Sequence, residues 1–154
     1  MSQDFKEFFE LLNSKRIDYL VIGGVAFNFH ARPRATKDID LWVRPDRESL
    51  TRLIAAIAEF GFPVDGLDLD DLAANQRVLM LGRPPHRIDI LTRPSGVVWE
   101  PCWEARVASD YSGAPVHYLS LDHLIAAKRA AGRPRDLADV AELERVRASG
   151  RGPG

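Results

Sequence analysis

The sequence has almost no cysteine, no strong charge of either sign and no long apolar run. Cys102 is the only cysteine in 154 residues, which excludes an intramolecular disulfide and a cysteine-based zinc site. The net charge of −1, from 21 basic and 22 acidic residues, disfavours a surface built to bind duplex nucleic acid over its whole extent. No apolar stretch approaches the roughly 20 residues of a membrane span, and the N-terminus does not resemble a signal peptide. We therefore expect a soluble, cytoplasmic protein without membrane contact.

The composition and the apolar spacing predict one mixed domain. Hydrophobic residues make up 45% of the chain and charged residues 28%, as in ordinary globular proteins. The periodicity predicts helices over 3–15, 25–31, 46–61, 67–74, 99–107, 121–131 and 135–147, and strands over 17–22, 37–44, 77–81, 86–91 and 116–119. We predict an α+β (mixed α/β) fold over residues 1–147, with a small mixed sheet flanked by helices, helices at the C-terminal end, and a flexible tail over 148–154.

Two aspartates alternate with apolar residues in the segment Lys-Asp-Ile-Asp-Leu-Trp-Val over residues 37–43. Because strand side chains alternate between faces, Asp38 and Asp40 share one face of a strand. Two strand rises separate them by roughly 6.6 Å, and at about this distance two like charges repel by roughly 3 kcal/mol at an effective dielectric of about 20. A divalent cation relieves this repulsion, and Mg²⁺ prefers such hard oxygen ligands. The alternative is an edge strand whose outer face meets water.

A third aspartate, Asp89, lies between β-branched residues in a second predicted strand, Arg-Ile-Asp-Ile-Leu over residues 87–91. Taken alone, it is either a solvated carboxylate or a partner for Arg87. Three aspartates on two apolar strands are a better-specified pattern, typical of two metal ions, or one metal ion and a base, in phosphoryl or nucleotidyl transfer. We therefore predict that Asp38, Asp40 and Asp89 are catalytic and bind Mg²⁺, or Mn²⁺ in its place.

The pair Gly23-Gly24 ends an apolar strand and precedes a predicted helix. This arrangement presents backbone N–H groups at the positive end of a helix dipole, and glycine lets the backbone approach a triphosphate closely. The alternative is a tight turn without a ligand. Thirteen residues, 25–37, separate the turn from Asp38, enough for one helix that returns a second strand beside the first. The phosphate-binding backbone and the carboxylates would then meet.

Basic residues lie near both parts of this pattern. Arg34 and Lys37 precede the paired aspartates and are predicted to bind nucleotide phosphates, with a solvated loop as the alternative. Lys128 shares a helix face with the apolar residues of 121–131, so it points inward and needs an anion. That anion is either the nucleotide phosphate or Asp136 on the following helix.

Together these motifs resemble the nucleotidyltransferase superfamily typified by DNA polymerase beta. The resemblance covers about residues 10–145 and is carried by Ile22-Gly23-Gly24, by Asp38-Ile39-Asp40-Leu41 and by Asp89 on a later strand. The C-terminal run 119–125, with Lys128, Gly132-Arg133-Pro134, Asp136 and Asp139, is similar to small stand-alone bacterial members, including those of toxin–antitoxin systems.

The resemblance implies the nucleotidyltransferase fold and a Mg²⁺-dependent enzyme that transfers a nucleoside monophosphate from an NTP such as ATP to a hydroxyl, with release of pyrophosphate. Asp38 and Asp40 would bind the metal ion, Asp89 would complete the site or deprotonate the hydroxyl, and Gly23 and Gly24 would hold the triphosphate. RNA, protein and small molecules remain open as the acceptor. A second interpretation is a catalytically weak module that binds nucleotides or a toxin–antitoxin partner. A third, a metal-dependent nuclease, explains the glycine pair less well.

Overall fold

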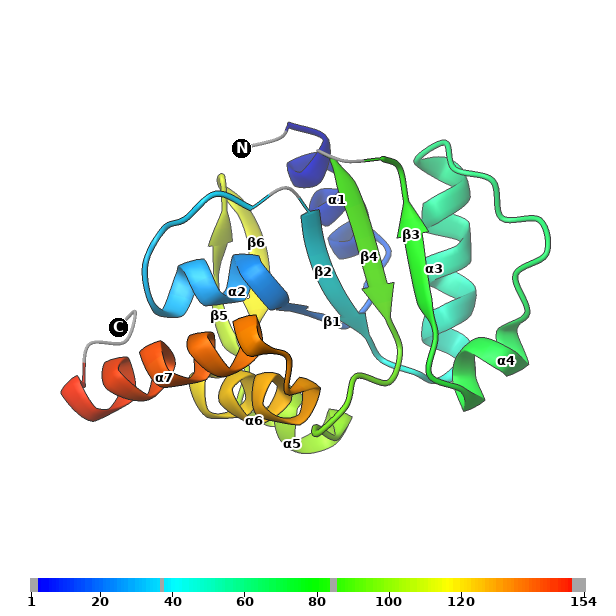
Figure 1. Ribbon diagram of the computed structural model, residues 1–154. Coiled ribbons are helices and arrows are strands. Elements are labelled where there is room, and N and C mark those ends of the chain that lie inside the picture. The colour runs from blue at the N-terminus through cyan, green and yellow to red at the C-terminus, as the bar shows by residue number, and fades with distance from the viewer. Residues whose placement is uncertain (1–2, 37, 84–85, 151–154) are drawn as a thin grey trace.

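A computed structural model describes residues 3–36, 38–83 and 86–150 (Figure 1). Its helices are α1 (Gln3–Ser14), α2 (Gly23–His30), α3 (Arg47–Glu59), α4 (Leu69–Ala74), α5 (Trp99–Glu104), α6 (Leu121–Ala131) and α7 (Pro134–Ser149). Its strands are β1 (Tyr19–Ile22), β2 (Asp38–Val43), β3 (Val78–Leu81), β4 (Arg87–Leu91), β5 (Val107–Tyr111) and β6 (Ala114–Tyr118). The mixed α+β fold is therefore confirmed.

The strands form one mixed six-stranded sheet in the order β3-β4-β2-β1-β6-β5. Helix α2 returns β2 antiparallel beside β1, and β3 and β4 form an antiparallel hairpin, as the sequence predicts. Strand β4 then joins β2 in parallel, so the two aspartate-bearing strands are neighbours. This parallel pairing is what brings the acidic residues together.

The two faces of the sheet are covered differently. Ile39, Leu41 and Val43 of β2 are buried on one face, where α1 and α3 pack against the sheet (Figure 1). On the other face, α2 packs against β1 and β2, with α6 and α7 beside it, whereas β4 and β3 are less covered (Figure 1). The alternation of β2 therefore directs its apolar residues into the core and its aspartates toward the partly open face.

The C-terminal half differs from the sequence prediction in two places. The helix expected over 99–107 ends at Glu104, and Val107 instead begins β5, a strand absent from the prediction. This strand forms an edge of the sheet, and only Tyr111 in it is buried, so its apolar alternation is weak. The last helix continues through Ser149, so Ala148 and Ser149 are not part of a loose tail; Gly150 caps the helix in the left-handed conformation. Residues 151–154 of the expected tail lie outside the described residues.

Among the helices within the described residues, none combines the length and the apolar character that a bilayer crossing requires.

Candidate active site

Three carboxylates converge on one face of the sheet. Asp40 on β2 lies opposite Ile22 on β1 and opposite Asp89 on β4, and Asp89 lies opposite Met80 on β3. A row across the sheet therefore reads Ile22, Asp40, Asp89, Met80. Asp38 is two residues from Asp40 and shares its face. The structure thus brings together the three aspartates singled out in the sequence.

The glycine turn packs directly against Asp40. Gly23 has a φ of +65°, and a Cβ added to it would lie 2.1 Å from Asp40 Oδ2, so only glycine fits both the backbone and the contact. At Gly24 an added Cβ would lie 3.0 Å from Thr36 Oγ1. Ile22, the N-cap of α2, makes no side-chain hydrogen bond to the helix, so the first-turn N–H groups remain available to an anion beside the carboxylates.

The carboxylates carry more negative charge than their surroundings neutralise. Burial, reinforced by the neighbouring carboxylates of Asp89 and Asp38, raises the pKa of Asp40 to about 6. Asp38 Oδ1 is buried and accepts no hydrogen bond from the described residues. A buried oxygen without a partner, beside a carboxyl that resists ionisation, marks a place for a cation.

Arg87 neutralises part of this charge. Its Nε and Nη2 donate to Asp89 Oδ1 and Oδ2 at 2.8 and 3.0 Å, and its Nη2 lies 3.2 Å from Asp38 Oδ2. The contact between Asp89 and Arg87, one of the two alternatives from the sequence, is therefore present, and it coexists with the convergence of the three aspartates. Asp40 makes no ion pair within the described residues, which leaves it the least compensated of the three.

The residues are chemically suited to hold a Mg²⁺ ion. Within the described residues, no three side chains of aspartate, glutamate, histidine or cysteine are already arranged to hold a metal ion, and Asp89 faces Arg87 instead. However, Mg²⁺ is usually held by one or two carboxylates together with substrate phosphates and water. Asp38 and Asp40 supply those two carboxylates, and the unpartnered Asp38 Oδ1 supplies a free ligand atom.

A buried ion cluster joins α6, α7 and the segment before β2. Lys128 points inward, as its helix position predicts, and its Nζ lies 2.9 Å from Asp139 Oδ2 and 4.0 Å from Asp136 Oδ1. Asp139 also receives the Arg34 guanidinium through two hydrogen bonds of 2.8 and 2.9 Å. Asp136, in turn, accepts from the Arg133 backbone N–H at 3.2 Å and caps α7. The cluster fixes both cations beside the carboxylates.

Replacing Asp139 with asparagine is expected to destabilise the protein by about 2–4 kcal/mol at pH 7, because Lys128 and Arg34 would lose their common anion. Although burial opposes the shift, hydrogen bonds from Arg34 and Lys128 lower the pKa of Asp139. The stabilisation is therefore complete above the unfolded-state pKa of about 4 and is lost as the pH falls below it. Urea denaturation at pH 7 and pH 3 measures the difference.

A matched control lies three residues along the same helix. Glu142 pairs with the exposed Arg32, so Glu142→Gln should lower the free energy of unfolding by less than about 1 kcal/mol. Equal losses for the two variants would contradict the buried cluster.

Of the two predicted phosphate-binding residues before β2, the structure describes Arg34 but not Lys37. Arg34 is held by Asp139, and its guanidinium lies 3.8 Å over the Phe27 ring, but it still lines the cleft above the carboxylates. Lys37 lies outside the described residues, so its role in nucleotide binding stays a prediction.

These groups surround one polar cleft of about 470 Å³, which we call the carboxylate cleft. It is lined by Gly23, Gly24, Arg34, Ala35, Thr36, Asp38, Asp40, Arg87, Asp89, Lys128, Arg133, Arg135, Asp136 and Asp139. Its volume lies in the usual range of small-ligand sites. Arg87, Arg133 and Arg135 lie outside the site predicted from the sequence. The helix break at Gly132-Arg133-Pro134, directly after the inward-pointing lysine, is the signal that could have indicated the last two.

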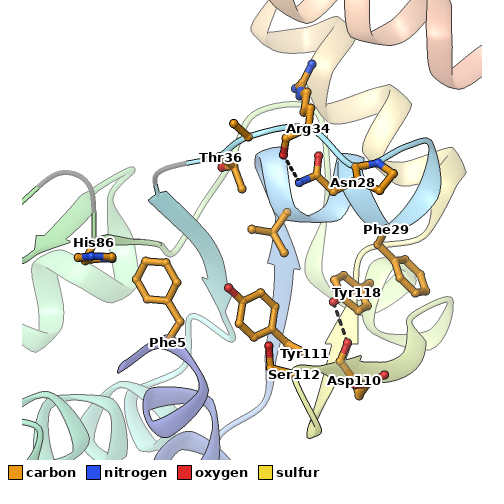
Figure 2. A pocket seen from close by; sticks show the side chains of 13 residues that line it. Phe5, Asn28, Phe29, Arg34, Thr36, His86, Asp110, Tyr111, Ser112 and Tyr118 are labelled. Atoms are coloured by element: carbon orange, nitrogen blue, oxygen red, sulfur yellow. Dashed lines mark hydrogen bonds between the residues drawn. The ribbon is translucent and has the colours of Figure 1, made fainter. Parts of the chain in front are cut away.

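A second cavity, of about 720 Å³, is bordered by the segment 33–36 (Figure 2). Several aromatic rings line it, among them Phe29 and Tyr118, whose ring centroids stack at 4.0 Å. Tyr118 donates to the backbone oxygen of Asp110 at 3.0 Å, and Asn28 donates to that of Arg34 at 2.8 Å (Figure 2). This aromatic cavity contains none of the three converging aspartates.

Comparison with known proteins agrees with the geometry. Residues 3–147 match the family described as nucleotidyltransferase of unknown function (DUF6036). No curated protein matches the chain in sequence.

Three solved structures share the fold at low identity. The lincosamide antibiotic adenylyltransferase LnuA, lincomycin-bound, has a TM-score of 0.64 at 13% identity over 95% of this chain and 98% of its own. An antigenic nucleotidyltransferase-like protein from Paracoccidioides brasiliensis has a TM-score of 0.54 at 20% identity over 90% of this chain and 72% of its own. The antibiotic-resistance factor ANT(2″)-Ia, in complex with adenylyl-2″-tobramycin, has a TM-score of 0.53 at 16% identity over 96% and 94%.

Proposed function

This chain belongs to the DUF6036 family of nucleotidyltransferases, and from that premise we propose that it transfers a nucleoside monophosphate from an NTP, such as ATP, to a hydroxyl group in a Mg²⁺-dependent reaction. The observation that supports this most strongly is the row of carboxylates beside a glycine turn that only glycine can form. We assign Asp38, Asp40 and Asp89 as catalytic residues on this basis. We assign nucleotide binding to Gly23, Gly24, Arg34, Lys37 and Lys128.

In the proposed reaction the acceptor oxygen forms a bond to the α-phosphorus while the bond from that phosphorus to the bridging oxygen breaks. Pyrophosphate leaves, and the hydroxyl proton passes to Asp89 or to water. When bound, Mg²⁺ supplies charge stabilisation for the phosphoryl oxygens. Asp38 and Asp40 would hold this ion, and the first-turn N–H groups of α2 would bind the leaving phosphates. Manganese could take the place of magnesium, since both prefer oxygen ligands.

The charges of the cleft are arranged for this substrate. A triphosphate brings negative charge to a cleft that already holds three aspartates, so cations must lie nearby. Arg87, Lys128, Arg133 and Arg135 all line the cleft. Arg87, Lys128 and Arg133 are held by ion pairs, and Arg135 lies at the break between α6 and α7. All four therefore face the cleft before the nucleotide enters.

Removing divalent ions is expected to abolish both nucleotide binding and transfer. The test uses α-labelled NTPs with RNA, protein and small-molecule acceptors, and follows label transfer together with pyrophosphate release. EDTA should stop both, and excess Mg²⁺ should restore both. A Mg²⁺-dependent rise in melting temperature with a non-hydrolysable ATP analogue provides a readout that needs no acceptor. Nucleotide turnover that persists at full rate in EDTA would contradict the proposed Mg²⁺-dependent reaction.

No described feature bears on the toxin–antitoxin partner suggested by the resemblance, so that partner stays a prediction. The nucleotide-binding module without turnover is separated from the enzyme by the same assay. A module would show the Mg²⁺-dependent shift in melting temperature without pyrophosphate release.

A further inference from the structure

Two large apolar side chains are exposed on the catalytic face of the sheet. Val78 and Met80 on β3 are 45% and 61% exposed. Met80 lies opposite Asp89 and Val78 opposite Leu91, so both continue the face that carries the aspartates. Neighbouring exposed apolar side chains beside a site can form part of a binding surface.

These side chains belong to a groove of about 470 Å³, which we call the β3 groove. Its apolar wall consists of Val78, Met80 and Leu91 on the sheet and of Leu124, Ala127 and Ala131 on α6. Asp40 and Asp89 line both this groove and the carboxylate cleft. The two spaces are therefore continuous at the reacting centre.

The direction of the reaction places the acceptor in this groove. In an in-line displacement the attacking and leaving oxygens lie on opposite sides of the phosphorus. The leaving pyrophosphate would lie over Gly23, at the end of β1. Crossing the sheet from there, the row passes Asp40 and Asp89 and ends at Met80. An attacking hydroxyl therefore comes from the side of β4 and β3, about one or two strand spacings of 4.8 Å from Asp40.

The aromatic cavity of Figure 2 does not meet this requirement. It is lined by Asn28 and Phe29 of α2, by the segment 33–36 and by His86 before β4, and it includes neither Gly23 nor Gly24. It also lacks the aspartates that would meet the attacking group.

The charges of the β3 groove disfavour a nucleic-acid acceptor. A bound RNA strand needs free basic groups to replace its counterions. Four basic residues line the groove. Arg87, Lys128 and Arg133 are paired with aspartates of the protein, and in the carboxylate cleft they also face the proposed triphosphate. Arg135, without an ion pair in the described residues, is then the one cation left for an RNA backbone, which is too few. At the other end the groove offers Gln76, which donates to Ser95 Oγ at 3.1 Å, and both side chains are neutral.

We propose that the β3 groove is the acceptor site and that the acceptor is a small hydroxyl-bearing molecule with an apolar face. Its apolar face packs on Val78 and Met80, its far polar groups meet Gln76 and Ser95, and one hydroxyl reaches the α-phosphorus beside Asp89. The inference rests on the proposed nucleotidyl transfer, because the in-line argument needs the triphosphate at Gly23.

The chain offers a direct reporter of groove occupancy. It contains two methionines, at the N-terminus and at position 80, so a protein labelled with ¹³C-methyl methionine gives one internal methyl signal, from Met80. We would titrate it, with Mg²⁺ and α,β-methylene ATP present, against a panel of small hydroxylated ring compounds (phenyl glycosides, aminocyclitols and nucleosides) and against a ten-nucleotide single-stranded RNA. At least one small compound should shift the Met80 signal, whereas the RNA should not.

A charge placed on the groove floor gives the second test. Met80→Glu should raise KM for the small acceptor by at least about tenfold relative to KM for the NTP, because the apolar face would meet a carboxylate. Leu137→Glu is the matched control, since Leu137 is also 50% exposed but lies on α7 outside the groove, and it should change neither KM.

These experiments distinguish a failure of the proposed function from a failure of the acceptor site alone. If Mg²⁺ and the ATP analogue give no thermal shift, the proposed function fails and the acceptor site fails with it. If that shift is present but the Met80 signal responds to no small compound, or only to the RNA, the acceptor site alone is overturned. An acceptor KM that rises no more in Met80→Glu than in Leu137→Glu overturns it as well.

Discussion

Replacing Asp40 with asparagine is expected to lower nucleotidyl transfer by about 10³-fold or more, because the metal ion would lose the carboxylate at the centre of the site. Asp40 lies between the glycine turn and Asp89 in the row across the sheet, so it is the carboxylate that would hold a metal ion beside both the bound phosphates and Asp89. The amide keeps the shape of the side chain and removes only its charge. Steady-state pyrophosphate release at saturating Mg²⁺ measures the loss.

The same substitution should stabilise the metal-free protein by about 1–2 kcal/mol at pH 8. The folded-state pKa of Asp40, about 6, lies above the ordinary value of 3.8 for an aspartate, so ionised Asp40 opposes folding. This loss of folding stability is complete above pH 6 and disappears as the pH falls below about 4, where the carboxyl is neutral in the folded and the unfolded state. Asp40→Asn should therefore show a higher melting temperature than the parent protein in EDTA at pH 8, but not at pH 4.

A carboxylate remote from the cleft provides the control. Asp65 is exposed in the loop between α3 and α4, so Asp65→Asn should change neither activity nor stability appreciably. If Asp40→Asn kept its activity, or lost stability in EDTA at pH 8, the carboxylate row would not be a metal site.

The sequence predicts the chemistry of this site better than its internal contacts. Alternation over residues 37–43 is sufficient to put Asp38 and Asp40 on one face, because strand geometry fixes that outcome locally. The position of Asp89 beside Asp40 depends on the parallel pairing of β2 and β4, with Asp38 in register with Arg87. Register between strands separated by more than 40 residues leaves no periodic signal. The contact of Arg87 with Asp38 could therefore not be predicted, whereas its contact with Asp89 on the same strand was one of the two alternatives from the sequence.

Strand β5 and the partner of Lys128 also depend on tertiary packing that the sequence does not reveal. Strand β5 has little apolar alternation because one side of it lacks a neighbouring strand and much of it meets solvent. The inward direction of Lys128 follows from helical spacing, whereas the choice of Asp139 over Asp136 as its nearest partner depends on how α6 crosses α7. Local pattern identifies which groups need partners, and tertiary packing decides which partners they meet.

Gly23→Ala is the substitution that tests the link between the glycine turn and the carboxylates. An alanine Cβ would lie 2.1 Å from Asp40 Oδ2 and 2.8 Å from its Cγ, so Asp40 must move away from the row. We expect about a 10²-fold loss of nucleotidyl transfer, because small displacements of catalytic groups are that costly. The free energy of unfolding should fall by about 2–4 kcal/mol, from backbone strain at φ +65° together with the displaced carboxylate.

Gly150→Ala separates these two contributions. Gly150 has a φ of +68°, and an added Cβ there would meet nothing within 4 Å, so this variant shows the cost of the left-handed backbone alone, about 1–2 kcal/mol, with full activity. The excess loss in Gly23→Ala then measures the contact with Asp40. Should the two variants be equally stable and equally active, the turn would not be packed against the carboxylate, and a triphosphate held at Gly23 would have no reason to meet a metal ion at Asp40.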